Sequence, residues 1–405
     1  MSIEWFKNAI IYQIMVDRFS TSDNQQDKYL AGKTSNNWMG GNLKGIIKHL
    51  NYTKKLGINV LYLSPIYQTS AYHGYSITDF FKIDSHFGKE KDLERLVKLC
   101  HKNEMRLILD FVPNHLSREH PFFIDAIKNE KSKYKKWFIF KKWPHEYLCF
   151  LDVKEIPKIN VNNKEAGEYV ISAAKYWLEK FDIDGYRIDY ATGPSLEFFK
   201  ELKKELKKLK KDFVLMGEAG KALGSYWKEI FKKEFIGSIW MIKSLSNQER
   251  KRIESLVEKW DLNSCIEYND IFMKKLENVM DGCIDFSFRD LAWAFAQGKI
   301  KLNEFLEKLE KHLRGFKKNY LISFLSNHDC GRFFSLFGKE KTMLLSLIQF
   351  LLEGPTIIYY GEEIGMKGER AFEEARRFMC WEENLWDKEL FNHYSILCKL
   401  KLKNK

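Results

Sequence analysis

The stretch Gly185-Tyr186-Arg187-Ile188-Asp189-Tyr190 alternates in the manner of a buried β-strand, and it follows the turn-rich segment 182–184. Arg187 and Asp189 stand two residues apart, so on a strand their side chains point to the same face. The guanidinium can then lie beside the carboxylate and stabilise its ionised form. An ionised, oriented carboxylate at the end of a strand is suited to act as a nucleophile. An isolated Arg-x-Asp pair is more often a structural ion pair, so this assignment depends on the rest of the chain.

Seven further segments have the apolar, β-branched character of buried strands, and helical segments separate them. The predicted strands are 10–16, 59–66, 106–112, 185–190, 213–219, 283–288, 320–325 and 356–360. Helices are predicted at 43–56, 91–103, 164–181, 194–211 and 341–352, more than one helix within 289–317, and a helical tail. This repeated alternation predicts an α/β fold in which a parallel sheet closes into a (β/α)8 TIM barrel. A doubly wound open sheet is the alternative, but no Gly-x-Gly-x-x-Gly turn supports it.

Two segments depart from this alternation. In residues 115–160 the apolar residues have neither helical nor strand spacing, and Lys and aromatic residues are interleaved. We therefore predict a small domain here, inserted after the third strand, between barrel segments 1–114 and 161–405. Residues 222–282 are mostly helical in pattern and longer than a simple crossover requires. No pattern of a C-terminal β-sandwich follows the eighth predicted strand. A chain of 405 residues suits one barrel of roughly 250 residues with insertions.

The charge, the cysteine content and the apolar runs of the chain limit the kinds of partner and the cell compartment that we expect. The net charge of +12 comes largely from helical stretches such as 201–211, and no nucleic-acid-binding motif accompanies it. Seven scattered Cys without a Cys-x-x-Cys pair indicate reduced thiols. No signal peptide and no apolar run of about 18 residues is present, so we expect a cytoplasmic protein without a membrane span. A secreted chain without its leader would have the same sequence, and association into a homo-oligomer is left open.

Acidic residues follow several of the predicted strands. Asp110, Asp189, Glu218 and Asp329 each lie at or near the carboxyl end of one strand, which is the rim where the active sites of TIM barrels are built. Carboxylates are costly to place there unless they serve a reaction. Two carboxyl groups that flank one bond, one ionised and one protonated, are the groups that glycoside hydrolysis requires.

Five short motifs, in this order along nearly the whole chain, resemble the α-amylase family of glycoside hydrolases. They are Tyr72–Tyr75 (YHGY), Asp110–His115 (DFVPNH), Gly185–Asp189 (GYRID), Met216–Ala219 (MGEA) and Phe324–Asp329 (FLSNHD). The resemblance implies that Asp189 is the nucleophile and Glu218 the general acid/base. It also implies that Asp329 binds sugar hydroxyls and helps to keep Glu218 protonated.

The same resemblance assigns substrate-binding and supporting roles to further residues. Arg187 would orient Asp189, and Tyr75 would stack on the sugar ring. The remaining residues of this group would hydrogen-bond the sugar or support the site, and they are His73, Asp110, Asn114, Asn327 and His328. A lone His is more often a structural residue, but His73 and His328 lie inside the motifs.

The segment Ile156–Asn160 (IPKIN) resembles the Met-Pro-Lys-x-Asn signature of neopullulanases, cyclomaltodextrinases and maltogenic amylases. Those enzymes usually carry an extra N-terminal β domain, whereas the first predicted barrel strand begins near Ile10 here. Many α-amylases have Lys-His after the nucleophile strand, and residues 191–194 read Ala-Thr-Gly-Pro instead. The resemblance implies a retaining hydrolase acting on α-1,4-glucosidic bonds of maltooligosaccharides, cyclodextrins or starch fragments. A 4-α-glucanotransferase is the alternative, and a non-catalytic binding module is less expected because all three carboxylates are present.

The resemblance requires no cofactor, but it suggests a structural calcium site in the first loop. Asp23, Asp27, the Gly40 carbonyl and Asn42 match the spacing of a calcium site in related neopullulanases. Oxygen ligands of this kind suit Ca²⁺. Stronger ligands are common at the positions that Thr21 and Gln26 occupy, so a plain solvated loop is the alternative.

Overall fold

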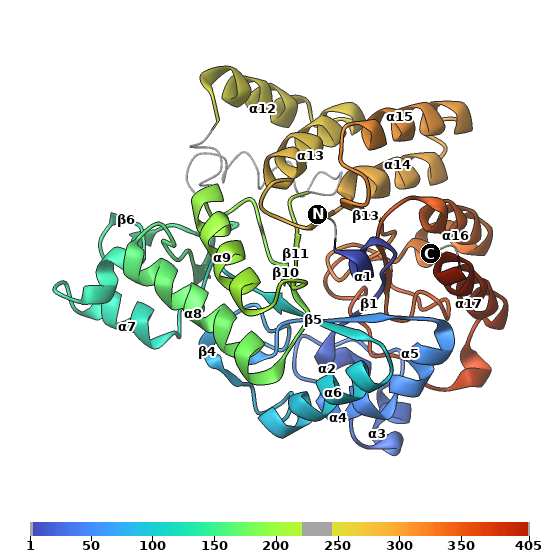
Figure 1. Ribbon diagram of the computed structural model, residues 1–405, viewed down its shortest axis with the longest axis horizontal. Helices are drawn as coiled ribbons and strands as arrows, with labels where there is room; N and C mark the ends of the chain where they lie inside the picture. The colour runs from blue at the N-terminus through green and yellow to red at the C-terminus, as the bar shows by residue number, and fades with distance from the viewer. Residues whose placement is uncertain (1–2, 221–244, 404–405) are drawn as a thin grey trace. The chain divides into compact units, whose positions relative to one another are not determined.

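The computed structural model describes residues 3–220 and 245–403 of the chain (Figure 1). These residues belong to two compact units. The first unit comprises 1–64, 84–109 and 284–405, and the second comprises 65–83 and 110–283.

The first unit holds the parallel strands β14 (Thr356–Tyr359), β1 (Ile10–Ile14), β2 (Val60–Leu63) and the start of β5 (Arg106–Phe111), side by side in this order. Every residue of β1, β2 and β14 is buried. Parallel strands that are covered on both faces have this continuous apolar character. The short strand β13 (Leu321–Ile322) is followed by Ser323, which forms a parallel bridge with Thr356.

The second unit holds the parallel strands β10 (Gly185–Ile188), β11 (Val214–Gly217) and β12 (Gly282–Ile284). At the carboxyl end of β5, the amide of Asp189 donates to the carbonyl of Phe111 over 2.9 Å. The hydrogen-bonded order of the eight parallel strands is β13-β12-β11-β10-β5-β2-β1-β14. The predicted (β/α)8 barrel is confirmed.

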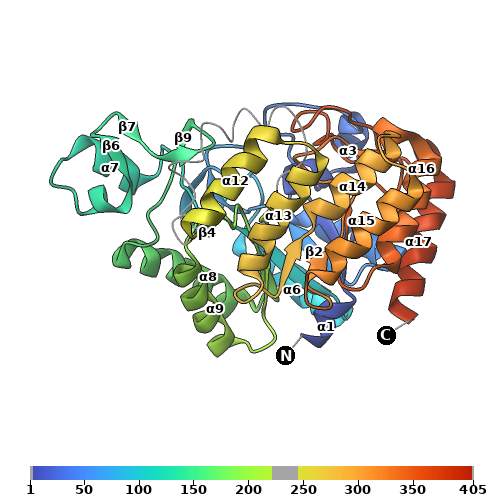
Figure 2. The same cartoon turned by 90° about the horizontal axis from the view of Figure 1, so that it is seen from above.

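Long helices follow the strands, as the sequence predicts. In the first unit they are α6 (Glu90–Lys102), α14 (Phe286–Ala296), α15 (Leu302–Arg314), α16 (Phe333–Leu351) and α17 (Lys388–Lys403), and α14 to α17 pack side by side (Figures 1 and 2). In the second unit they are α8 (Lys164–Phe181), α9 (Leu196–Leu209), α12 (Asn247–Lys259) and α13 (Leu262–Leu276). No helix among the described residues is long and apolar enough to cross a bilayer.

Several element boundaries differ from the sequence prediction. β13 covers only two residues of the predicted strand 320–325, and α16 begins at Phe333, before the predicted helix 341–352. Two further differences have a local cause. The helix predicted at 43–56 is two helices, α4 (Leu43–Lys48) and α5 (Leu50–Leu56), because His49 between them departs from helical dihedral angles. The strand predicted at 283–288 ends at Ile284, because the Asp285 side chain accepts the Phe288 amide over 2.9 Å and begins α14 there. A capping side chain thus overrides the apolar pattern of this segment.

The segment 115–160 contains α7 (Pro121–Lys128), the 3-10 helix η1 (Lys133–Trp137) and two short hairpins, β6 (Phe140–Lys142) with β7 (Glu146–Tyr147) and β8 (Cys149–Phe150) with β9 (Val153–Pro157). A further hairpin, β3 (Tyr67–Thr69) with β4 (Ile77–Ile83), carries the Tyr72–Tyr75 motif in its loop. In the segment predicted as mostly helical at 222–282, residues 221–244 lie outside the described residues, and α12 and α13 follow.

We expect Gly45→Ala to destabilise the protein, although helix propensity alone favours Ala over Gly by about 1 kcal/mol. A Cβ atom at Gly45 would lie 1.8 Å from the Ser20 carbonyl oxygen, so α4 would have to move away from this backbone. Overpacking of this kind typically costs about 1–3 kcal/mol. Denaturant unfolding would measure the change, with the exposed neighbour Lys44→Ala as control. A Gly45→Ala variant as stable as the parent would contradict this packing.

Candidate active site

Two strand ends in the second unit carry the predicted catalytic carboxylates. Asp189 comes directly after β10, and Glu218 comes directly after β11. Asp110 lies in the last part of β5, and Arg187 lies in β10. Asp110, Arg187 and Asp189 are buried, and the Glu218 side chain is 14% exposed.

The guanidinium of Arg187 joins the three carboxylates. Its Nη1 donates to Oδ1 and Oδ2 of Asp110 over 2.9 and 3.0 Å, and to Oδ1 of Asp189 over 2.8 Å. Its Nη2 lies 2.8 Å from Oε2 of Glu218. A guanidinium is planar and always charged, so it holds its partners in a fixed geometry. Asp189 and Glu218 are thereby held at the two terminal nitrogens of one cation, which offsets their mutual repulsion.

The backbone after β10 supports Glu218. The amide of Tyr190 donates to Glu218 Oε2 over 3.1 Å, and Tyr190 has a φ of 45°. A positive φ is uncommon for a bulky residue and marks local strain, which the surrounding contacts must hold in place. Among these contacts, the carbonyl of Tyr190 accepts the Gly193 amide over 2.8 Å, and its ring lies edge-on to Phe150.

The Tyr72–Tyr75 motif places two further predicted residues. The hydroxyl of Tyr75 donates to Asp110 Oδ2 over 2.8 Å, and the Arg187 guanidinium lies 5.9 Å from the Tyr75 ring centre. The Tyr75 amide donates to His73 Nδ1 over 3.1 Å, which places the proton of a neutral imidazole on Nε2 as a donor. Gly74 between them has a φ of 85°, and a Cβ there would lie 2.3 Å from the Pro65 carbonyl oxygen, so this turn requires glycine.

Asn114 is held by Lys158, a residue for which the sequence predicted no such role. The buried Lys158 Nζ donates to Asn114 Oδ1 over 2.7 Å and to the Gly193 carbonyl over 3.0 Å. Asn114 Nδ2 lies 3.2 Å from His115 Nδ1. Burial, with the Lys158 charge nearby, lowers the pKa of His115 to about 3, so this imidazole is neutral. Lys158 stands in the IPKIN motif, which had indicated only a branch of the family.

The other predicted residues, Asn327, His328 and Asp329, lie in the first unit, in the turn after β13. Asp329 Oδ1 accepts from Arg376 Nη2 over 2.8 Å, and Asp329 Oδ2 lies 3.4 Å from His328 Nε2. His328 Nδ1 lies 2.8 Å from Gln13 Nε2. The turn is thus held by Gln13 and Arg376, which sequence reasoning missed. Gln13 is the one polar residue of β1, and this was an available signal; nothing in the sequence singled out Arg376.

Two buried glutamates, separated from the end of β14 by two residues, were also missed. Glu362 Oε1 accepts from the Tyr394 hydroxyl over 2.8 Å. Burial raises the pKa of Glu362 to about 7. Glu363 accepts from the hydroxyls of Tyr12 and Tyr52, and burial raises its pKa as well. The rule that acidic residues at barrel strand ends are informative would have found both.

The first loop does not present open calcium ligands. The Asp23 side chain accepts the Gln25 amide over 2.8 Å as the N-cap of α3 (Asn24–Leu30). The Asn42 side chain accepts the Gly45 amide and donates to the Gly40 carbonyl, each over 3.0 Å. Among the described residues, no three His, Cys, Asp or Glu side chains gather in the manner of a metal site.

Asp27, the buried member of the predicted calcium set, already has a cation. Its Oδ1 accepts the Thr21 amide over 2.6 Å, and its Oδ2 accepts from the Ser20 hydroxyl over 2.6 Å and from Lys48 Nζ over 2.5 Å. The ammonium of Lys48 therefore lies against the oxygen that a calcium ion would need. Like-charge repulsion disfavours a divalent ion beside it, so these residues do not fit calcium.

We expect the melting temperature to be the same with 5 mM EDTA, which removes calcium, as with 5 mM CaCl₂. The latter concentration exceeds micromolar calcium more than about a thousandfold. Lys48→Met should destabilise the protein by about 1–3 kcal/mol, because it leaves a buried carboxylate without its charged donor. Lys44→Met, on the exposed face of the same helix, is the matched control. Thermal unfolding with and without the two additives is the measurement, and a calcium-dependent melting temperature of the parent would contradict the assignment of Lys48.

The family model for the alpha-amylase catalytic domain matches residues 13–393, so the chain belongs to the α-amylase family. Alpha-amylase 2 of Dictyoglomus thermophilum is 35% identical over 98% of this chain and 63% of its own length. A cyclomaltodextrinase of a Bacillus species is 31% identical over 98% of this chain and 66% of its own length. The chain thus spans a little under two thirds of these relatives.

Solved structures agree with this assignment. A cyclomaltodextrinase superposes with a TM-score of 0.80 at 29% identity, over 99% of this chain and 64% of the other. A cyclic α-maltosyl-(1→6)-maltose hydrolase from Arthrobacter globiformis superposes with a TM-score of 0.79 at 25% identity, over 98% of this chain and 83% of the other. Other relatives are named maltogenic α-amylase and neopullulanase, so the predicted family and branch are confirmed.

Proposed function

We propose that this chain is a retaining glycoside hydrolase that cleaves α-1,4-glucosidic bonds of maltooligosaccharides, cyclodextrins or starch fragments. The observation that carries the proposal is the Arg187 guanidinium, which holds Asp189 and Glu218 at the ends of adjacent strands. A retaining mechanism needs two carboxyl groups about 5–5.5 Å apart. The names of the relatives, which include cyclomaltodextrinases and a maltogenic α-amylase, support this class of substrate.

In the first step, the Asp189 carboxylate attacks the anomeric carbon of the sugar. The bond from that carbon to the glycosidic oxygen breaks, and this oxygen takes a proton from Glu218 as the shortened glucan leaves. Both Glu218 contacts fall on Oε2, so we assign the proton to Oε1. The product of this step is a glycosyl ester on Asp189.

In the second step, the Glu218 carboxylate takes a proton from water, and the water oxygen attacks the anomeric carbon. The ester bond breaks, Asp189 regains its negative charge, and Glu218 is protonated again. Negative charge therefore passes from Asp189 to Glu218 and back. Arg187 binds both carboxylates, so one fixed cation stabilises whichever of them is ionised.

The other predicted residues are assigned to binding and support. His73 offers its Nε2 proton to a sugar oxygen, and Tyr75 offers a ring face while its hydroxyl fixes Asp110. Asn114, which Lys158 holds by a hydrogen bond, acts as a positioning residue. On the family resemblance, Asp329 and His328 bind sugar hydroxyls, and Asn327 fixes their turn by accepting the Asp329 amide over 3.0 Å.

We further propose that the protein acts in the cytoplasm. No disulfide joins any of the seven cysteines, which all lie among the described residues, and six of them are buried. Reduced thiols are usual in that compartment. One relative is named the intracellular maltogenic amylase of Bacillus subtilis.

The two carboxylates should respond differently to isosteric substitution. Asp189→Asn should abolish the covalent intermediate, because an amide cannot attack the anomeric carbon. Glu218→Gln should still form it from an α-glucosyl fluoride, whose leaving group needs no proton, and should hydrolyse it about 10²–10⁴-fold more slowly. Mass spectrometry of the protein after mixing would detect the added sugar.

The exposed Glu201→Gln on α9 is the control and should behave as the parent. If Asp189→Asn accumulated the glycosyl-enzyme, the assignment of the nucleophile would be wrong.

A second measurement separates hydrolysis from transfer, in which a sugar hydroxyl replaces water in the second step. We expect maltoheptaose to give only shorter maltooligosaccharides and one reducing end for each bond cleaved, because water is the acceptor. Chromatography of the products with a reducing-end assay would check both. Products longer than seven glucose units with a constant number of reducing ends would instead establish a 4-α-glucanotransferase.

A further inference from the structure

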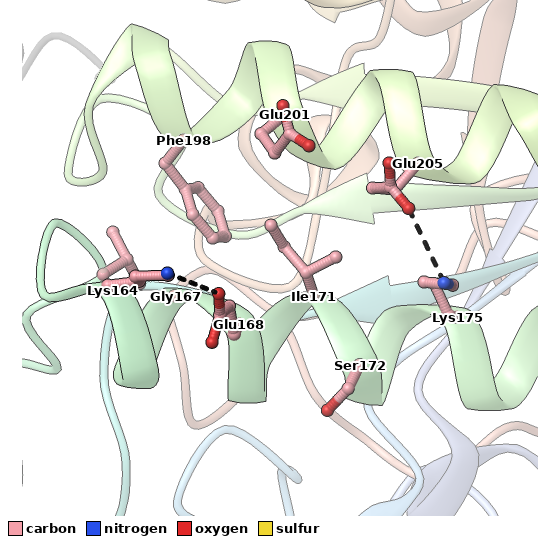
Figure 3. A pocket seen from close by; sticks show the side chains of 10 residues that line it. Lys164, Gly167, Glu168, Ile171, Ser172, Lys175, Phe198, Glu201 and Glu205 are labelled. Atoms are coloured by element: carbon pink, nitrogen blue, oxygen red, sulfur yellow. Dashed lines mark ion pairs between the residues drawn. The ribbon is translucent and has the colours of Figure 1, made fainter.

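Two surface pockets of the same volume, about 460 Å³ each, differ in their chemistry. One lies between α8 and α9 in the second unit, with Ile171 and Phe198 among its lining residues (Figure 3). Its charges are already paired within the protein: Lys175 lies 3.6 Å from Glu205, and Lys164 lies 4.0 Å from Glu168. Glu201 lies 3.0 Å from Lys204, outside the pocket lining. A groove whose charges are already neutralised in this way offers little to a polar ligand.

The second pocket, here called the aromatic pocket, lies in the first unit. It is lined by rings from α5, from the segment before α17 and from α17 itself, and by polar side chains at its edge. The rings are Tyr52, Trp386 and Phe391, and the polar residues are Lys55, Glu383, Lys388 and Asn392. The side chains of these four polar residues make no ion pair or hydrogen bond with the described residues.

The three rings form a fixed apolar wall. The ring centres of Tyr52, Trp386 and Phe391 lie 5.5 to 5.8 Å apart, and Phe391 is tilted by 34° to each of the others. Their polar atoms are used inside the protein, because Tyr52 donates to the buried Glu363 and Trp386 Nε1 donates to the Cys380 carbonyl over 2.8 Å. The rings therefore present carbon surfaces to the pocket, and their positions are fixed before any ligand binds.

The combination of groups selects a class of ligand. An apolar ligand would use the rings and leave the four exposed polar side chains to water. An anion would pair with Lys55 or Lys388 but would use neither the rings nor the carboxylate of Glu383. A sugar has C–H faces that pack on aromatic rings and hydroxyl groups that both donate and accept hydrogen bonds. Its hydroxyls can pair with ammonium, carboxylate and amide groups alike. A volume of about 460 Å³ is within the range of small-molecule pockets.

We propose that the aromatic pocket is a second carbohydrate site, which binds a short segment of α-glucan without cleaving it. The choice of α-glucan rests on the proposed function, whereas the preference for a sugar rests on the pocket itself. None of its residues belongs to the carboxylate cluster on Arg187. Such a site would retain the protein on a polymer and leave the cleavage of short substrates unchanged.

The experiment compares retention on a polymer with turnover of a short substrate. Mobility in native gels containing amylose measures retention, and kcat/KM for maltotriose measures catalysis. We expect Trp386→Ala to weaken retention about tenfold, the equivalent of about 1.4 kcal/mol, and to keep kcat/KM within twofold. Asn392→Ala and Lys388→Ala, both at the exposed edge of the pocket, should also weaken retention. Because exposed substitutions leave the fold intact, these variants test the pocket even if Trp386→Ala misfolds.

Phe198→Ala in the α8–α9 pocket is the matched control and should be retained like the parent. Retention of Trp386→Ala equal to that of the parent would overturn the proposal, whether or not the chain cleaves glucans. Retention on heparin in place of amylose would overturn it in favour of an anionic ligand. A changed elution volume of the Trp386 variant with unchanged amylose retention would overturn it in favour of an interface between copies. A parent retained by amylose but inactive on every glucan would contradict the proposed function alone.

Discussion

The contact of one guanidinium with three carboxylates is the constraint on which the proposed glycoside hydrolysis depends. Arg187 binds Asp110, Asp189 and Glu218, each from the end of a different strand. Three buried or half-buried negative charges without this cation would repel one another and lose hydration, which costs several kcal/mol for each ion. The fold meets this requirement by placing Arg187 and Asp189 on one face of β10, between β5 and β11. The ion pair thus links the geometry of the barrel to the proposed catalytic geometry.

Supporting contacts around the strand ends follow the same physical rule, in which a buried polar group needs a partner. Lys158 fixes Asn114 and the Gly193 carbonyl, and Gln13 fixes His328. Lys48 serves Asp27 in a similar way in the first loop. In each case the protein's own side chain supplies the donor or cation that the buried group requires. The first loop can therefore be held in place without a metal ion.

The two surface pockets show that volume alone is a poor guide to binding. Their volumes are equal, but the charges of the α8–α9 pocket are already paired within the protein, whereas the polar side chains of the aromatic pocket make no ion pair or hydrogen bond with the described residues. Rings whose polar ends are already bonded within the protein lose little freedom when a ligand binds, which lowers the entropic cost of association. The difference between the pockets lies in which polar groups are already satisfied.

The sequence by itself determined the barrel. Eight buried strands that alternate with helices can be recognised from the spacing of apolar residues along the chain, which needs no tertiary information. It also determined the carboxylates at the strand ends, since Asp189 and Glu218 directly follow predicted strands. Only the tertiary structure decided which side chains support them, because Lys158 and Arg376 come from segments distant along the chain. The first loop is the clearest case: ligand spacing suggested calcium, but the ammonium of Lys48 reaches Asp27 from the next helix. Spacing along a loop cannot reveal a charge that another element brings to it.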